Sequence, residues 1–369
     1  MSGRKIICIL LCLAMLPAMT VLGLTAQQSS EELAQLLGTD RDHLLSSDEL
    51  TAGDSNSDWA VFVAARNGAT RGKDRYLEKL WDYVSDQYRA QGGLDPIKAT
   101  QWHRITLTVL SLGADPTCFG TDAEGKPINL VADGTYNWKM TNSLGSQGIN
   151  GWIYALLVLD AVNAEIPEDA LYTRERIMEE ILASQLPDGG FDIGSGASGI
   201  DITAMAIQAL APYYERDREI QQRIDGALSY LSNAQNAQGD FGSGGSESSA
   251  QVILALCALG IDPEEDARFC KPGGNALDGL LLYHQTDGGF SHTMNGKVNT
   301  LSTLQAAQAL TALDRLRTGR GRLYDFSDLS IQPYAPGGTV LWWIPVVVLT
   351  SMVIVMILWI RKGKKSCTA

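Results

Sequence analysis

The fold is decided by a stretch that occurs three times, and its clearest copy reads Leu231-Ser232-Asn233-Ala234-Gln235-Asn236-Ala237-Gln238-Gly239-Asp240-Phe241. The other two copies occupy residues 181–191 and 281–290 and share the glutamine, a glycine and the final phenylalanine. The three glutamines are 50 residues apart each time, at positions 185, 235 and 285. A fixed period of this length indicates an architecture that stacks one supersecondary unit.

Each copy leads to a segment that is rich in alanine and leucine and poor in charge. Six such segments recur at intervals of roughly 50 residues, at residues 59–65, 102–112, 152–162, 202–210, 249–256 and 304–310. Segments that are apolar on nearly every side predict buried helices. Amphipathic segments lie between them, at residues 76–88, 173–184 and 221–233, and predict helices on the surface. Weaker copies of the repeat loop are expected at residues 91–95 and 133–136.

This alternation predicts an all-α fold in which an inner ring of apolar helices lies inside an outer ring of amphipathic helices. An open solenoid of helical pairs is the alternative. The closed ring is favoured because the inner segments are too apolar to line an exposed concave surface.

The pattern formed by Tyr230, Leu231, Gln235, Gly239 and Phe241 resembles the glutamine–aromatic repeat of squalene and other terpenoid cyclases and of protein prenyltransferase β subunits. The run from Asp201 to Ala206 is also similar to exported bacterial proteins with this repeat, and to corrinoid-carrier proteins. The resemblance covers residues 58–315 and implies an α/α toroid of about six helical hairpins. It implies less about activity, because one fold hosts unrelated chemistries.

The sequence lacks the motifs that would carry the chemistry of these families. It contains no Asp-x-Asp-Asp, which protonating cyclases use, and no Asp-Asp-x-x-Asp, which ionising cyclases use. It also has no zinc-binding Asp-x-Cys and no thioester Cys-Gly-Glu-Gln. We therefore predict no catalytic residue, metal or cofactor, and a module that binds a small corrinoid- or isoprenoid-like molecule or a surface protein. The alternative is an enzyme of the terpene cyclase, prenyltransferase or polysaccharide lyase type, for which His103 is a candidate acid or base.

Polar side chains and tryptophans gather where the inner helices are predicted to begin. The candidate ligand-binding residues are Asp201, Thr203, Glu247, Ser249, Asn299, Ser302, Trp102 and Trp152. Backbone N–H groups at helix starts are ready donors for a ligand, and tryptophans suit a flat or apolar one. The polar residues are also good helix caps and the tryptophans suit a core, so a structural role is the alternative. His292 lies near the same helix starts.

The two ends of the chain are predicted to be targeting segments. Residues 1–26 have the charged, apolar and small-residue layout of a signal peptide, although a retained membrane helix is the alternative. Residues 341–360 carry no charge and are long enough to span a bilayer. The basic tail 361–369 is expected to stay in the cytoplasm. These segments predict a single-pass protein of the cell membrane whose toroid, residues 27–325, lies outside the cell on a linker formed by residues 326–340.

Charge and cysteine content narrow the classes of partner. The chain has 29 basic and 42 acidic residues, and six of the basic ones lie in the two terminal segments, so 23 remain against 42. A body with a balance of −19 argues against nucleic acid and favours neutral or cationic partners. Its three cysteines, Cys118, Cys257 and Cys270, cannot form a full disulfide framework, and their pairing stays open. The histidines lack metal-ligand spacing.

Overall fold

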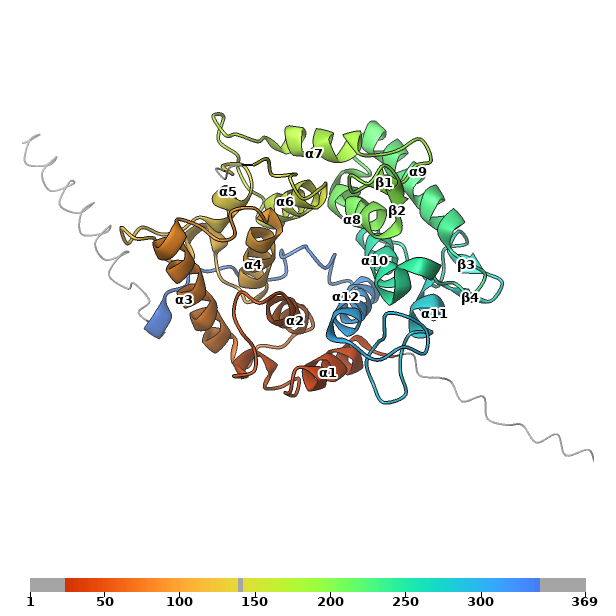
Figure 1. The fold of residues 1–369 in the computed structure, drawn as a ribbon, viewed down its shortest axis with the longest axis horizontal. Coiled ribbons are helices and arrows are strands. Elements are labelled where there is room, and N and C mark those ends of the chain that lie inside the picture. The colour runs from red at the N-terminus through yellow and green to blue at the C-terminus, as the bar shows by residue number, and fades with distance from the viewer. Residues whose placement is uncertain (1–23, 139–141, 339–369) are drawn as a thin grey trace, which may run out of the picture.

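The computed structural model describes residues 24–138 and 142–338, which form two concentric layers of helices (Figure 1). The inner layer consists of α2 (Ser55–Arg66), α4 (Ala99–Ser111), α6 (Asn150–Ala161), α8 (Ile200–Leu210), α10 (Gly245–Ala258) and α12 (Thr300–Arg317). Each inner helix packs against the next, and α12 packs against α2. The ring is therefore closed, as the apolar character of the inner segments predicts.

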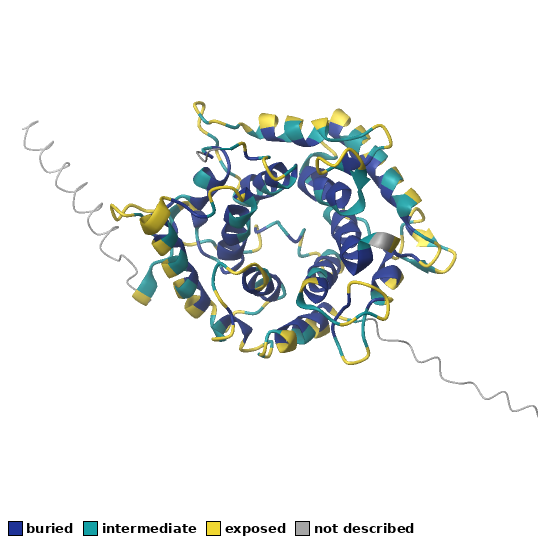
Figure 2. Cartoon of the chain, viewed as in Figure 1, coloured by how far each residue is buried: buried dark blue, intermediate teal, exposed yellow. Residues whose placement is uncertain are grey.

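The outer layer alternates with the inner one along the chain. It consists of α1 (Ala26–Leu36), α3 (Lys73–Gln91), α5 (Leu130–Gly134), α7 (Arg174–Ala183), α9 (Arg218–Ala234) and α11 (Ala276–Leu281). Figure 2 shows inner helices that are buried on most sides and outer helices whose outward faces are exposed. The predicted division into apolar inner and amphipathic outer helices is thus the physical division of the fold. The structure differs from the prediction at residues 133–136, which were expected to form a repeat loop. The first two of these residues are the last two of α5.

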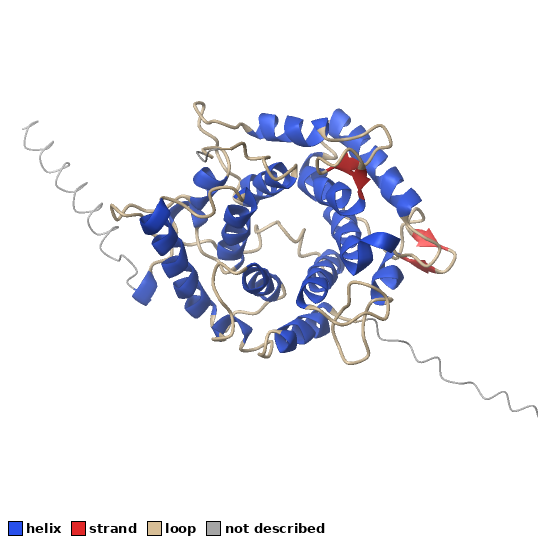
Figure 3. Ribbon diagram, viewed as in Figure 1, coloured by secondary structure: helices blue, strands red, loops and turns tan. Residues whose placement is uncertain are grey.

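Short elements connect these helices (Figure 3). The 3-10 turns are η1 (Leu44–Ser46), η2 (Pro116–Cys118), η3 (Ala211–Tyr213), η4 (Gly242–Gly244) and η5 (Pro336–Gly338). Two antiparallel ribbons pair β1 (Phe191–Asp192) with β2 (Ser198–Gly199), and β3 (Cys270–Lys271) with β4 (Gly274–Asn275). In each pair the first residue of one strand lies opposite the last residue of the other.

The repeated stretch joins neighbouring hairpins through its glutamine and its phenylalanine. The Gln235 amide donates to the Gly239 carbonyl at 2.8 Å and to the Phe269 carbonyl of the following connection at 3.0 Å. Phe241 is only 2% exposed. Gly239 has a φ of +95°, and a Cβ at this position would lie 2.1 Å from the Asn275 carbonyl oxygen. Glycine is therefore required both by the backbone conformation and by the close approach of the next hairpin.

The helix α1 completes the outer layer at the seam where the two ends of the ring meet. Thr25 caps it in a capping box with Gln28, and Asn67 at the end of α2 donates to the Ala26 carbonyl at 3.0 Å. On the other side, Glu32 accepts from the Gly289 amide at 2.9 Å. From the sequence, the toroid is predicted to begin at residue 27, and no helix is predicted for the residues that form α1. The helix was missed because glutamines, serines and glutamates fill most of its positions, and its short apolar face gives only a weak helical pattern.

The segment 318–338, called the floor segment below, runs from α12 across one end of the ring. Its Gln332 pairs with the connection after α4, donating to the Gly113 carbonyl and accepting from the Asp115 amide. Tyr334 packs edge-on against Trp81, with ring centroids 5.9 Å apart. Residues 326–338 are therefore packed against the ring and are not the free linker that is predicted from the sequence.

The floor segment also shows that the inner helices are parallel. It contacts or lies beside the carboxyl ends of α2, α4, α6, α10 and α12. The amino ends of the inner helices therefore share the opposite end of the ring, which we call the mouth. Within residues 24–138 and 142–338 no helix is both long and apolar enough to cross a membrane. The predicted signal peptide, residues 1–26, lies almost wholly outside the described residues, as does the predicted span at 341–360.

Candidate functional site

A polar network at the mouth joins side chains from three consecutive inner helices. Asp201 stands in the first turn of α8, and its Oδ1 accepts a short hydrogen bond from the Ser248 hydroxyl of α10. The neighbouring Glu247 accepts from the Ser302 hydroxyl of α12 at 2.6 Å. Its other oxygen lies 2.8 Å from Nδ1 of His292, in the loop before α12.

Asn299 completes this network as the cap of α12. Its Oδ1 accepts from the Ser302 backbone N–H at 2.9 Å, and its amide donates to the Ser302 hydroxyl, also at 2.9 Å. Asp201, Glu247, Ser248, His292, Asn299 and Ser302 together form the mouth network. Because residues 47 to 55 positions apart meet here, the ring creates a site that no single stretch of sequence contains.

The two carboxyl groups of the mouth network have different protonation behaviour. Burial raises the pKa of Asp201, and the nearby charge of Glu247 raises it further, against the hydrogen bond from Ser248. For Glu247, burial alone would raise the pKa, but the hydrogen bonds from Ser302 and His292 outweigh it and hold the pKa below its ordinary value. Two carboxyls whose pKa values are pushed apart suit one acid and one stabilising anion. Asp201 is thus the group best suited to give up a proton.

Two of the predicted polar residues do not reach this network. The Thr203 hydroxyl is fully buried, accepts from the Phe191 backbone N–H at 2.8 Å and donates to the Gly199 carbonyl at 2.6 Å. It holds the repeat loop, as Thr303 does for Phe290. Ser249 is buried inside α10, and its hydroxyl has no hydrogen-bond partner among the described residues.

The predicted tryptophans and His103 belong to the core between the layers. Trp102 is 1% exposed and packs edge-on against Tyr88 and Trp138. Trp152 is buried and packs edge-on against Tyr172 at 5.0 Å. His103 is fully buried, with Nε2 2.7 Å from the Gly134 carbonyl, and burial lowers its pKa to about 4. These side chains have the packing role that the sequence analysis gave as the alternative.

A different set of aromatic side chains reaches into the ring. Trp59 of α2 and Tyr154 of α6 have ring centroids 6.0 Å apart, although α4 separates their helices around the ring. They must therefore meet in the interior. Tyr324 of the floor segment is hydrogen-bonded to Tyr154 and stacks on Phe62 at 5.6 Å. The interior thus has an aromatic side near α2 and α6.

The opposite side of the interior is lined by amides. Gln208 of α8 donates to the Gln251 side chain of α10 at 2.9 Å, and Gln251 donates to the Gln305 side chain of α12 at 3.2 Å. Asp201 and Met205 precede Gln208 at positions that share one face of α8. The acid therefore stands at the mouth above Met205 and this chain of amides.

We compared the chain with known proteins. No protein-family profile matches it. Drimenyl diphosphate synthase from Streptomyces showdoensis is 24% identical over 261 residues, which cover 68% of this chain and 48% of that protein. The chain thus spans about half the length of this relative. Protein geranylgeranyltransferase-I from Candida albicans, solved in complex with GGPP, superposes with a TM-score of 0.50 and 12% identity. That match covers 85% of this chain and 95% of the other and shows the fold alone.

The chain is thus similar in sequence to drimenyl diphosphate synthase, and it shares the α/α-toroid fold of protein geranylgeranyltransferase-I. Among the residues that the structure describes in this toroid, no group of three or more histidine, cysteine, aspartate or glutamate side chains could hold a metal ion. The described cysteines Cys118, Cys257 and Cys270 are free thiols.

Sequence reasoning found part of the mouth network and missed the rest. It selected Asp201, Glu247, Asn299 and Ser302, which the ring does bring together. It missed Ser248 as the partner of Asp201, and it named His292 without a role. The serine run at positions 246, 248 and 249 was the available signal. Ser248 and Ser249 are both buried, and only their angular positions on α10 decide that Ser248 reaches Asp201 while the Ser249 hydroxyl has no partner among the described residues.

Proposed function

We propose that this toroid binds an unsaturated, isoprenoid-like molecule in its interior and protonates it, with Asp201 as the acid. One observation carries the proposal: the carboxyl group of Asp201, whose pKa burial raises, stands at the mouth of a ring that has aromatic side chains inside. A protonated carboxylic acid beside a carbon–carbon double bond can act as a general acid.

The chemical step moves one proton. The Asp201 carboxyl gives its proton to one carbon of the double bond, leaving a carbocation on the other carbon and a carboxylate on Asp201. Ser248 donates a hydrogen bond to that carboxylate, which stabilises it as the charge develops. Loss of a proton from a neighbouring carbon, after any ring closure, regenerates a double bond, so the product is an isomer of the substrate.

The aromatic side of the interior supports the same proposal. Faces of tryptophan and tyrosine attract a cation through the ring quadrupole. Trp59 and Tyr154 face one another across this side, where they could stabilise a carbocation that forms below Asp201. The curated relative is named for drimenyl diphosphate, which supports an isoprenoid diphosphate as one substrate class. The carboxyls at the mouth would repel a diphosphate and favour an apolar part of the ligand there.

Turnover by the purified full-length chain tests the proposal. Squalene and prenyl diphosphates of increasing length are incubated with it, and products of unchanged mass are sought by chromatography and mass spectrometry. We expect Asp201→Asn to lower turnover by about 10²–10⁴-fold, the usual contribution of a general acid. Asp287→Asn is the control for the substitution itself, because Asp287 is an exposed aspartate in the third repeat loop, away from the mouth network. Equal losses in both variants would contradict the role of Asp201.

Turnover should also depend on pH. Since Asp201 must be protonated to act, and its pKa is raised, activity should fall as pH rises above that pKa. An activity that is flat across the acidic and neutral range would exclude Asp201 as the proton donor.

A second function is binding without turnover, and the amide chain favours it. Amide oxygens of Gln208, Gln251 and Gln305 would intercept a carbocation, whereas they suit a polar, neutral ligand. In this case, native mass spectrometry of the purified chain should reveal a co-purified molecule. The ligand should be retained without turnover, and an Asp201→Ala, Glu247→Ala double variant that still folds should lose it.

We further propose that the toroid lies outside the cell and is anchored by residues 341–360, on the basis of the sequence alone. Protease added to intact cells should then remove the body and leave the basic tail protected. Protection of the body would contradict this topology.

A further inference from the structure

The floor end of the ring contains a cavity below the amide chain, with Gln208 and Tyr324 in its lining. The proposed proton transfer from Asp201 does not use it. The cavity has a volume of about 210 Å³ and lies between the carboxyl ends of α6, α8, α10 and α12, closed by residues 322–325 of the floor segment. Its apolar lining includes Leu157, Leu254, Ala258 and Ala312. The cavity lies at the opposite end of the inner helices from Asp201, so it is not part of the mouth network.

A surface groove leads into this cavity. The groove, of about 480 Å³, is lined by η3, the end of α10 and the turn after α12. Groove and cavity share Pro212, Arg216, Ala258 and Arg322 among their lining residues. Two arginines therefore stand where the groove meets the cavity.

These two guanidinium groups differ from their neighbours because no carboxylate lies in close contact with them, although the charge of Arg322 acts on Asp160 and Asp325 from a longer distance. Arg315 is bound to Asp328, Arg317 to Asp262 and Glu264, and Arg320 to Asp314. By contrast, the guanidinium groups of Arg216 and Arg322 make no hydrogen bond and no ion pair with any residue that the structure describes. Free guanidinium donors at a cavity entrance match the planar, two-oxygen geometry of a carboxylate or phosphate.

An acceptor that lacks a donor lies inside the cavity. The Oδ1 atom of Asp160 accepts from the Tyr213 hydroxyl at 2.8 Å and from Arg174 Nε at 3.1 Å. Its Oδ2 atom is buried and has no hydrogen-bond partner among the described residues. A buried carboxyl oxygen without a partner is costly, and a ligand hydroxyl or ammonium group would satisfy it.

We propose that the floor cavity and its groove form a second binding site for a small organic anion that carries a hydrogen-bond donor and a short apolar body. Arg216 and Arg322 bind its carboxylate or phosphate, Asp160 accepts from its hydroxyl or ammonium group, and Leu157, Leu254 and Ala312 contact its apolar part. The cavity volume limits this ligand to a short chain. The chain as a whole is acidic, so a site with two arginines at its entrance is a local region that can attract an anion.

Calorimetric titration of the full-length chain with matched probes tests this site. The complete probe is 2-hydroxy-4-methylpentanoate; 4-methylpentanoate lacks the donor, and 4-methylpentan-2-ol lacks the anion. 3-Hydroxy-3-methylbutyl phosphate carries the hydroxyl donor and the short apolar body with a phosphate in place of the carboxylate. We expect saturable binding of the hydroxy acid or of the phosphate, weaker binding of 4-methylpentanoate and none of the alcohol. No saturable binding of either anion that carries the proposed chemistry would overturn the proposal.

Variants place the binding at the floor. Arg322→Gln should weaken binding by at least about tenfold, as expected when a hydrogen bond to a charged group is lost. Arg216→Gln, at an exposed position that is not needed for folding, should act in the same direction. Arg218→Gln is the matched control, since this exposed arginine lies two residues after Arg216, at the start of α9, and lines neither the cavity nor the groove. Equal affinities in the cavity and control variants would overturn the proposal.

Two further variants separate this site from the mouth. Asp160→Asn should reduce the preference for the hydroxy acid over 4-methylpentanoate, because the donor then faces an amide. Asp201→Asn should leave the titration unchanged even where it abolishes turnover. Loss of anion binding in Asp201→Asn would contradict a separate floor site.

Discussion

The mouth and the floor of the ring are built from the opposite ends of the same six helices, and they differ in the charges of several helix-end residues. Asp58, Asp201 and Glu247 lie in the first turns of inner helices, whereas Arg66, Arg315 and Arg317 lie in last turns. Parallel helix dipoles favour this arrangement, because amino ends attract anions and carboxyl ends attract cations. The difference teaches that a toroid of parallel helices has two electrically distinct ends before any ligand binds.

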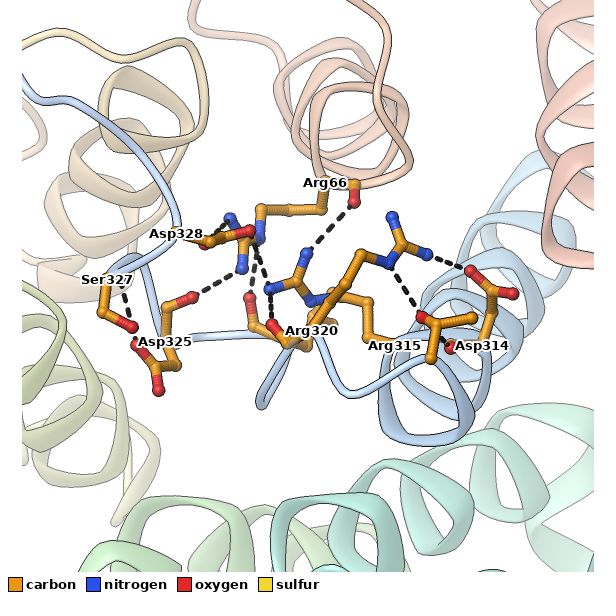
Figure 4. A network of polar contacts seen from close by, with 9 residues as sticks. Arg66, Asp314, Arg315, Arg320, Asp325, Ser327 and Asp328 are labelled. Atoms are coloured by element: carbon orange, nitrogen blue, oxygen red, sulfur yellow. Dashed lines mark hydrogen bonds and ion pairs between the residues drawn. The ribbon is translucent and has the colours of Figure 1, made fainter.

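The two ends also differ in what holds their charges. At the floor, Arg66 donates to Asp328 at 3.0 Å and to the Leu323 carbonyl at 3.0 Å, and Arg315 donates to the other oxygen of Asp328 at 3.0 Å. Figure 4 shows both arginines converging on this carboxylate from α2 and α12. At the mouth, Asp201 has a single side-chain partner and stays partly exposed. The charges of Arg66 and Arg315 at the floor are thus neutralised by other residues of the chain. At the mouth, the carboxyl group of Asp201 keeps hydrogen-bonding capacity that a ligand can use.

The largest effect on stability is expected at the floor. Asp328→Ala leaves Arg66 and Arg315, both 1% exposed at their side chains, without their shared counter-charge. Removing one partner of a fully buried ion pair costs about 3–5 kcal/mol of unfolding free energy. Because the Asp328 side chain is 33% exposed, we expect a loss near the lower end of that range. Denaturant unfolding measures this, with Asp86→Ala as the control for an exposed pair on α3. A loss no greater than that of the control would show that the floor segment does not depend on this carboxylate.

The pH dependence of stability should have opposite signs at the two ends. Burial would raise the pKa of Asp328, but Arg66 and Arg315 outweigh it and lower the pKa. Its contribution is therefore present above the unfolded pKa of about 3.9 and is lost as pH falls through the lower, folded pKa. For Asp201 the raised pKa means that the folded state binds the proton more tightly, so stability falls as pH rises from the unfolded to the folded pKa.

Unfolding of two variants as a function of pH checks these signs. Asp201→Asn should be more stable than the natural chain at neutral pH and lose this advantage in acid. Asp328→Asn should be less stable at neutral pH and lose this deficit in acid. The same pH response in both variants would contradict the contrast between the two ends.

The smallest effect is expected within the mouth network. Ser302→Ala removes the donor to Glu247 and should cost about 1.5–3 kcal/mol, the usual range for a hydrogen bond to a charged group. It should also raise the pKa of Glu247 toward its ordinary value, since this hydrogen bond helps to lower it. Ser229→Ala, at an exposed position on α9, is the control. No difference between the two variants would show that Ser302 acts only as a helix residue.

The sequence predicts the layers of this fold better than it predicts its site. The glutamines at 50-residue intervals and the apolar inner segments predict the ring, because each repeat must bury its inner helix against its neighbours. The contact between Ser248 and Asp201 has no such signal, since it depends on how consecutive repeats are rotated about the ring axis. The packing of the floor segment against the ring was missed because it too depends on contacts between residues far apart in the sequence. Arg66 and Asp328 are 262 residues apart, and residues 326–340 are predicted to be a linker because they are too few to form a second domain.

The contrast between linear patterns and contacts across the ring also explains why the sequence favours a binding module whereas the structure leads us to propose an acid catalyst. A search for Asp-x-Asp-Asp along the chain finds nothing, which favours a binding module over an enzyme. The ring assembles an acidic group from separate repeats, with Asp201 on one helix and Glu247 on the next. A linear motif cannot represent such a group, so its absence says little about acid chemistry in this toroid.

Turnover in deuterium oxide tests the role of Asp201 most directly. The carboxyl group of Asp201 exchanges its proton with solvent, so each catalytic cycle should place one solvent deuterium on carbon. We predict a product that contains one deuterium in place of one hydrogen when the full-length chain acts on an isoprenoid substrate, and about 10²–10⁴-fold slower formation of it by Asp201→Asn. A product without deuterium, or the same deuterated product formed at an unchanged rate by Asp201→Asn, would contradict the account.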